Sequence, residues 1–218
     1  MQPDAGAARQ ARAQSVHAAW YNQAQRVRHL RRVPYESQEA GVIELGPNDF
    51  LPLDRFQLRW RWTDPTWDRL PAAARAQIRP LSEAKAHELW DRTVRASSPS
   101  SALVAIAHRF TAALPAAHPP FSQLSRLDTA QLPPAVVAQW LTTLAPLSAD
   151  PVIVLWRPTE AIAVSWDVCC AYWTTFCYPA SDDASILPLD ESWCLEWSHD
   201  EYFLFGRLQP PASAPMPT

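Results

Sequence analysis

The chain has little glycine and almost no lysine, and it lacks the short motifs of the common catalytic sites. Its 218 residues include 4 Gly against 22 Pro, and Lys85 is the single lysine among 19 Lys and Arg residues. Loops that cradle phosphate need glycine, because their backbone must approach the ligand closely and adopt positive φ. No G-x-G-x-x-G, P-loop, G-x-S-x-G or H-E-x-x-H motif occurs. These absences argue against a nucleotide-binding protein, a serine hydrolase of the elbow type and a zinc protease.

The cysteines do not suggest a metal site. The four residues Cys169, Cys170, Cys177 and Cys194 form no C-x-x-C pair and have no zinc-ligand spacing with histidine. We expect buried, reduced thiols and neither a metal nor a cofactor. A nucleophile made of Cys177, His199 and an acid is an alternative that no local signature supports.

Neither an export signal nor a membrane span is recognisable. Residues 1–33 are polar throughout and lack the apolar core of a signal peptide. No uninterrupted apolar run approaches the roughly 20 residues that a membrane helix needs. We therefore expect a cytoplasmic protein with no membrane partner.

Charge is distributed unevenly along the chain. Residues 1–33 hold six Arg and one acid, whereas residues 151–207 hold two basic and nine acidic residues, a net charge of -7. An acidic surface repels the nucleic-acid backbone and attracts basic groups. The pattern predicts a basic protein as partner and no nucleic acid.

Composition and periodicity divide the chain into three parts. We expect a basic helical arm over residues 1–33, a single α+β domain over 34–207 and a disordered, Pro-rich tail over 208–218. Whether the arm is a docked helix, a free segment or an over-long gene start stays open. In the domain, a helical layer over about 66–146 is expected to pack on a mainly antiparallel sheet.

Local patterns predict the individual elements. Helical spacing predicts helices over 82–95, 100–114 and 134–144, and a shorter one over 168–176. Strict alternation over 56–62 predicts a strand with Trp60 and Trp62 facing the core and Arg59 and Arg61 facing solvent. Further strands are expected over 152–156, 161–166, 184–187, 193–198 and 202–207, with one short strand near 42–45, and 115–132 is expected to be an ordered loop.

The densest polar cluster lies near the C-terminus. Asp182 and Asp183 are followed, sixteen residues after Asp183, by His199, Asp200 and Glu201. A histidine near several carboxylates can act as a base, a metal ligand or a pH switch. Because turns also favour Asp and Ser, turn chemistry is the structural alternative.

Two tryptophans extend this cluster. Trp193 and Trp197 are four residues apart on an acidic strand, so they share one face of it while Glu196 occupies the other. We consider them candidates for contact with a partner.

Two stretches resemble a family of bacterial proteins of unknown function. They are Trp60-Arg61-Trp62-Thr63-Asp64 with Ile78-Arg79-Pro80-Leu81 and Trp90, and Tyr178-Pro179-Ala180-Ser181-Asp182-Asp183 with Trp193, His199, Glu201 and Phe203-Leu204-Phe205-Gly206. The resemblance implies no activity, because none is attached to the family. The closing Ser-His-x-Glu and Phe-Gly pattern is also similar to some bacterial toxin-immunity proteins.

Two hypotheses for the function follow. The first is a non-enzymatic, intracellular bacterial protein that binds a protein partner, in one version of the toxin-immunity type. Its acidic C-terminal surface would comprise Asp182, Asp183, Trp193, Trp197, His199, Asp200 and Glu201. The alternative is a small hydrolase or metal-dependent enzyme that uses Asp182, Asp183 and His199.

Overall fold

The computed structural model describes residues 42–64, 70–94, 98–110, 113–179 and 181–209. The expected arm over 1–33 and all but the first two residues of the expected tail lie outside this part of the chain. The predicted tail boundary at residue 208 is slightly too early, because Leu208 is the last residue of a strand.

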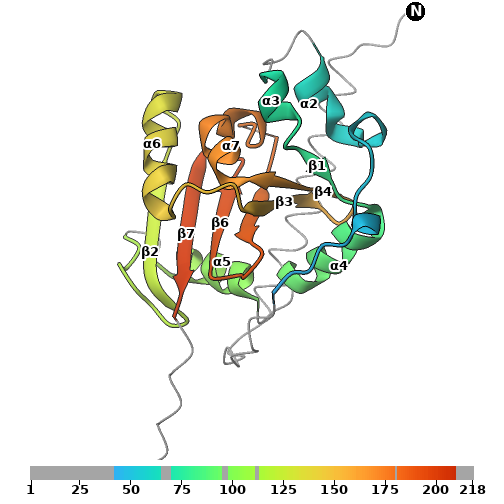
Figure 1. The fold of residues 1–218 in the computed structure, drawn as a ribbon. Coiled ribbons are helices and arrows are strands. Elements are labelled where there is room, and N and C mark those ends of the chain that lie inside the picture. Colours follow the sequence, from blue (N-terminus) through green and yellow to red (C-terminus); the bar gives the residue numbers. More distant parts are fainter. Residues whose placement is uncertain (1–41, 65–69, 95–97, 111–112, 180, 210–218) are drawn as a thin grey trace, which may run out of the picture. The chain divides into compact units, whose positions relative to one another are not determined.

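A seven-stranded sheet organises the described residues. Its order is β1-β4-β3-β5-β6-β7-β2, and every neighbouring pair is antiparallel. The hairpins β3–β4, β5–β6 and β6–β7 join strands that are adjacent in sequence (Figure 1). The predicted α+β class is confirmed. The strands are β1 (Arg79–Pro80), β2 (Phe121–Asp128), β3 (Pro151–Arg157), β4 (Glu160–Ser165), β5 (Ala184–Pro188), β6 (Trp193–Ser198) and β7 (Tyr202–Leu208).

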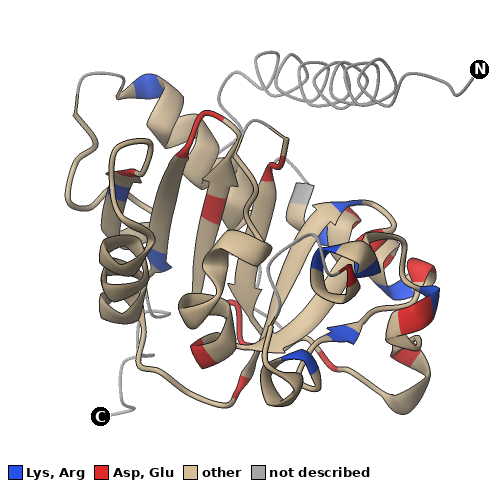
Figure 2. Cartoon of the chain, turned by 90° about the horizontal axis from the view of Figure 1, so that it is seen from above, with Lys and Arg blue, Asp and Glu red and all other residues tan. Residues whose placement is uncertain are grey.

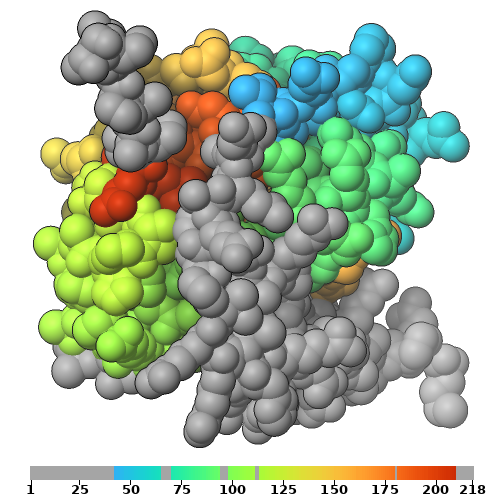
Figure 3. Space-filling model, turned by 90° about the horizontal axis from the view of Figure 1, so that it is seen from below, coloured from blue at the N-terminus to red at the C-terminus, as the bar shows by residue number. Residues whose placement is uncertain are grey.

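Helices cover both faces of this sheet, where the sequence predicted one helical layer. Along β3, Val154 packs in the core with α2, α6 and α7, whereas its neighbour Ile153 packs in the core with α4. The helix α5 packs on Cys194 and Leu204 of the same face, so α4 and α5 lie on the opposite face from α2, α6 and α7 (Figure 1). The space-filling view from below shows the green residues of this part of the chain (Figure 3). The described helices are α2 (Trp60–Thr63), α3 (Ala72–Arg75), α4 (Glu83–Val94), α5 (Pro99–Arg109), α6 (Pro134–Leu144) and α7 (Trp166–Ala171), with 3-10 turns at Pro47–Asp49, Leu53–Arg55, Gln57–Arg59 and Trp173–Thr175.

Several helices follow from local signals. Ser82 caps α4, since its hydroxyl accepts a hydrogen bond from the Lys85 N–H at 3.3 Å. The helix α6 spans the predicted range, and its apolar spacing buries Val137, Leu141 and Leu144. The predicted 168–176 helix is instead α7 followed by a 3-10 turn, and α7 begins earlier, after Ser165.

The segment over 56–62 is not the predicted strand. It forms a 3-10 turn and then α2, and its backbone bonds are local, such as the Arg59 N–H to the Phe56 carbonyl at 3.2 Å. Arg61, expected to face solvent, is only 4% exposed, and Trp60, expected in the core, is 37% exposed. Alternation misleads here because a short helical turn can also bury Phe56 and Trp62, which stack at 6.1 Å.

The loop expected over 115–132 contains β2. This strand pairs with β7 at one end of the sheet. Its partner is distant in sequence, so no local pattern indicates it. The short strand expected near 42–45 does not form, although the Ile43 N–H donates to the Leu189 carbonyl at 2.6 Å.

The different burial of the two tryptophans of α2 gives the first prediction. Trp62 is 1% exposed, so Trp62→Ala should lower the free energy of unfolding by about 3–5 kcal/mol. Trp60→Ala should cost less than Trp62→Ala, because 37% of Trp60 is already exposed to water. Urea unfolding of both variants compares the two costs. Equal losses would contradict this placement of α2.

Candidate functional site

A buried ion pair joins α2 to the loop before β5. Both terminal nitrogens of Arg61 donate to the carboxylate of Asp182, with Nη1–Oδ2 at 2.5 Å and Nη2–Oδ1 at 2.8 Å. The two side chains are 5% and 8% exposed. Asp182 Oδ2 also accepts the Tyr178 N–H at 3.0 Å. The pair therefore fixes Tyr178 and Asp182 to α2.

Aromatic rings surround the guanidinium of this pair. Arg61 Cζ lies 4.7 Å from the ring centroid of Tyr178, 5.1 Å from that of Trp156 and 5.4 Å from that of Trp60. The rings of Trp60 and Tyr178 stack on each other at 5.8 Å, with 8° between their planes. We call Trp60 and Tyr178 the aromatic platform. Stacking and cation–π attraction hold a partly exposed indole in a fixed position.

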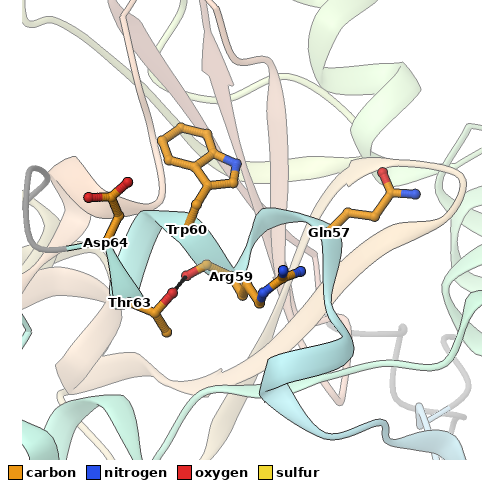
Figure 4. A pocket seen from close by; sticks show the side chains of 5 residues that line it. All are labelled: Gln57, Arg59, Trp60, Thr63 and Asp64. Carbon is orange, nitrogen blue, oxygen red and sulfur yellow. Dashed lines mark hydrogen bonds between the residues drawn. The ribbon is translucent and has the colours of Figure 1, made fainter.

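An open pocket of about 380 Å³ adjoins the platform. Figure 4 shows Trp60 and Asp64 projecting to one side of α2, and Arg59 and Thr63 to the other. The Thr63 hydroxyl donates to the Arg59 carbonyl at 2.9 Å, which ties the turn together. Gln57 completes the lining. The pocket thus combines an indole with groups of both charges.

The predicted cluster of Asp183 and His199 does form. Ala184 pairs with Trp197 across β5 and β6, which brings Asp183 beside the β6–β7 turn. The backbone N–H of His199 donates to Asp183 Oδ1 at 3.0 Å, and His199 Nδ1 lies 2.9 Å from the same oxygen. Burial raises the pKa of Asp183, and the hydrogen bonds from His199 oppose this. His199 Nε2 lies 3.6 Å from the exposed Asp200.

A family match covers most of these residues. The model of a family described as proteins of unknown function, DUF2947, matches residues 50–192. The chain belongs to the DUF2947 family. The match includes the aromatic platform and the ion pair, and it ends before His199. No curated protein and no solved structure matches the chain.

The two tryptophans expected at the surface of this DUF2947 protein lie in the core. Trp193 is 5% exposed and packs on Trp166 at 5.0 Å, while Trp197 is 2% exposed and packs on Phe203 at 4.7 Å. The strand β6 lies inside the sheet, and the helical layer that includes α7 covers this face of it. Trp193 and Trp197 are therefore not available to a partner.

The acidic surface expected over 151–207 is also largely internal. Glu160, Asp182, Glu191 and Glu196 are buried, and the Asp183 carboxylate is 8% exposed. Internal partners account for much of this, since Asp182 pairs with Arg61 and Glu191 with Arg92. Figure 2 shows the acidic residues of the described part of the chain scattered, with basic residues among them. Exposed acidic side chains remain at Asp167, Asp190 and Asp200.

Of the three residues of the enzyme alternative, the structure brings together only Asp183 and His199. Asp182 and Asp183 are consecutive but bind different partners, Arg61 and His199, so their carboxylates do not converge. Burial raises the pKa of the Cys177 thiol well above its usual value, which disfavours a thiolate nucleophile. Within the described ranges, no three His, Cys, Asp or Glu residues are grouped as metal ligands, and no helix is long and apolar enough to cross a membrane.

Sequence reasoning missed the roles of Arg61 and Tyr178. A charged residue between two tryptophans was a usable signal, because an arginine in an apolar segment needs a buried carboxylate or ring faces. The choice of Asp182 as the partner has no sequence signal, since 121 residues separate the two.

Disruption of the ion pair gives the second prediction. Asp182→Ala leaves the Arg61 charge buried and should lower the free energy of unfolding by about 3–5 kcal/mol. The control Asp200→Ala removes a carboxylate that is 71% exposed and should cost under about 0.5 kcal/mol. Urea unfolding provides both values. Arg61→Met/Asp182→Leu should be less damaging than Asp182→Ala alone, and the opposite order would contradict a buried-charge penalty.

A second buried carboxylate faces α5 rather than the site. Glu196 on β6 is 8% exposed, accepts a hydrogen bond from Ser185 Oγ at 2.8 Å and interacts with the Ser100 hydroxyl. Burial raises its pKa to about 7, against the opposing effect of the two hydroxyls. The folded protein therefore holds this proton more tightly than the unfolded chain does.

The titration of Glu196 gives the third prediction. Because its pKa is higher in the folded state, its contribution to stability is complete below about pH 4.5 and is lost as pH rises to about 7, by about 3 kcal/mol in total. Glu196→Gln should remove this part of the fall in unfolding free energy with rising pH. Urea unfolding at pH 5 and pH 8 measures the decline in each protein. An equal decline in both would show that Glu196 ionises normally.

Proposed function

We propose that this protein acts by binding a basic protein partner, with the aromatic platform at the centre of the contact. One observation carries the proposal: Trp60, a large aromatic side chain, is 37% exposed and held parallel to Tyr178 above a buried, charge-paired arginine. Tryptophan, tyrosine and arginine are the residue types that dominate the binding energy of protein interfaces. A fixed side chain also loses little conformational entropy when a partner docks.

An acidic turn on the Tyr178 side of the platform favours a basic partner there, whereas Arg59 lines the pocket on the Trp60 side. Tyr178 and Asp183 belong to one loop, and the Trp197 indole N–H donates to the Tyr178 carbonyl at 3.4 Å, so the loop and the β6–β7 hairpin lie together. The turn of this hairpin carries Asp200 and Glu201, of which Asp200 is exposed. The toxin-immunity version of the proposal depends on the same turn, because the resemblance to such proteins includes His199 and Glu201.

The fourth prediction tests this surface. The tagged full-length protein and its Trp60→Ala variant are used to capture proteins from a lysate of the source organism, and captured proteins are quantified by mass spectrometry. A true partner should be captured at least about tenfold less by Trp60→Ala, since truncating a hot-spot aromatic costs about 2 kcal/mol or more. Val42→Ala is the matched control, because Val42 is a more exposed apolar residue outside the platform.

The salt dependence of capture separates the two parts of the proposal. Asp200→Lys should weaken capture at low salt and have little effect at about 1 M salt, where the Debye length is about 3 Å. A protein captured equally by the native chain and Trp60→Ala would sink the platform proposal. If Trp60→Ala and Val42→Ala reduce the captured amount equally, the capture is nonspecific and apolar, and the platform proposal fails as well.

The orientation of His199 favours a second candidate function. The Asp183 carboxylate at Nδ1 orients the imidazole, and a carboxylate positions the histidine of many general-base sites in this way. Hydrolysis of a panel of ester, phosphoester and glycoside substrates would test it. The candidate requires turnover that His199→Ala abolishes while thermal unfolding changes little. Equal turnover in both proteins would exclude it.

A further inference from the structure

Within the described part of the chain, the last residues of β2 have no strand beside their outer edge. β2 ends the strand order, so one of its two edges pairs with β7 and the other faces outward (Figure 1). The chain just before β2 covers the first half of the outer edge, because the Leu124 N–H donates to the Ala116 carbonyl at 2.6 Å. Among the described residues, none bonds to the outer edge of the backbone over 125–128.

The alternation of the strand decides which residues offer their backbone groups outward. The Leu124 N–H points away from β7, so the N–H and C=O groups of Arg126 and Asp128 do the same. The Thr129 N–H donates to the Glu201 carbonyl beside β7 at 2.8 Å, as this alternation requires. Leu127 therefore bonds towards β7, and two residues with open backbone groups flank it.

These two residues carry opposite charges on one face of the strand. The side chains of Arg126 and Asp128 are 41% and 71% exposed and contact each other at 2.7 Å. We propose that β2 binds a second copy of this chain, antiparallel, with a two-fold axis at Leu127. Arg126 then lies opposite Asp128 of the partner subunit, and Asp128 lies opposite Arg126 of the partner subunit. Each pair forms two backbone hydrogen bonds and an ion pair.

Other registers are unfavourable. An axis at Arg126 or at Asp128 places two like charges directly opposite each other, which destabilises a strand pair. An axis between two residues places an outward residue opposite an inward one, so no hydrogen-bonded pair forms. The edge before residue 125 is already occupied by Ala116. Charge and alternation thus select the register centred on Leu127.

The helix beside this edge supplies the apolar part of the interface. Residues 129–149 contain no Asp, Glu, Lys or Arg. They include α6, whose Trp140 packs on Phe203, the β7 residue paired with Leu127. Val136, at the start of α6, is 45% exposed. Interface cores are depleted in charge, and a stable interface needs about 800 Å² per partner, which a short strand edge alone does not bury.

Charge exchange at two positions tests the pairing, and it is our fifth prediction. In analytical ultracentrifugation, the full-length protein should shift from monomer to dimer as its concentration rises about a hundredfold through the micromolar range. Arg126→Asp and Asp128→Arg each place like charges opposite each other in the dimer. Each should raise the dissociation constant at least about tenfold, and Arg126→Asp/Asp128→Arg should restore most of the affinity.

Two further measurements make the result decisive. The ion pair within one chain is exposed, so thermal unfolding should change little in any of the variants when it is measured at a concentration where all of them are monomeric. Arg55→Asp is the matched control, since Arg55 is exposed on a 3-10 turn away from β2 and should leave the dissociation constant unchanged. A native protein that stays monomeric would overturn the proposal. A dimer that persists in both single reversals, or whose affinity the double exchange does not restore, would overturn it too.

Discussion

The ion pair between Arg61 and Asp182 is the interaction on which the candidate site depends. A guanidinium removed from water needs a carboxylate and further polar or ring contacts, and Asp182, Tyr178 and two tryptophans provide them. The same contact holds Tyr178 and Asp182 together and supports the indole of Trp60. Because Asp183 follows Asp182 directly, the contact also sets the carboxylate that holds His199. One buried contact therefore positions α2, the loop before β5 and the β6–β7 turn.

Coverage of both sheet faces explains why most of the acidic residues of the C-terminal part do not form a surface. A side chain on an inner strand points into a core whichever way it faces, so Glu196 lies under α5 and Trp197 lies in the core of the opposite face. The hydroxyls of Ser100 and Ser185 stabilise the Glu196 carboxylate. Its pKa is still raised, since burial disfavours the ionised form. Net charge counted along a segment is a poor guide to surface charge in such a fold.

Two surfaces of the molecule carry distinct proposals. The aromatic platform contacts Trp156 on β3, whereas the open edge belongs to β2 at one end of the strand order. The platform presents fixed aromatic rings, and the edge presents backbone groups between opposite charges. A dimer formed through β2 leaves the platform of each subunit accessible, so one assembly would present two copies of it. Binding of a partner would then gain from bivalency if the partner is itself dimeric.

The sequence by itself determined the elements whose signals are local. Helices α4 and α6 and the hairpins from β3 to β4 and from β5 to β7 follow from apolar period, caps and turns, and the closeness of Asp183 to His199 follows from the hairpin between them. Only the tertiary structure decided that 56–62 is helical, that β2 is a strand and that Trp193 and Trp197 are buried. It also decided that Asp182 faces Arg61. In each of these cases the deciding partner lies far along the chain, and neither propensity nor period carries information about a contact of that kind.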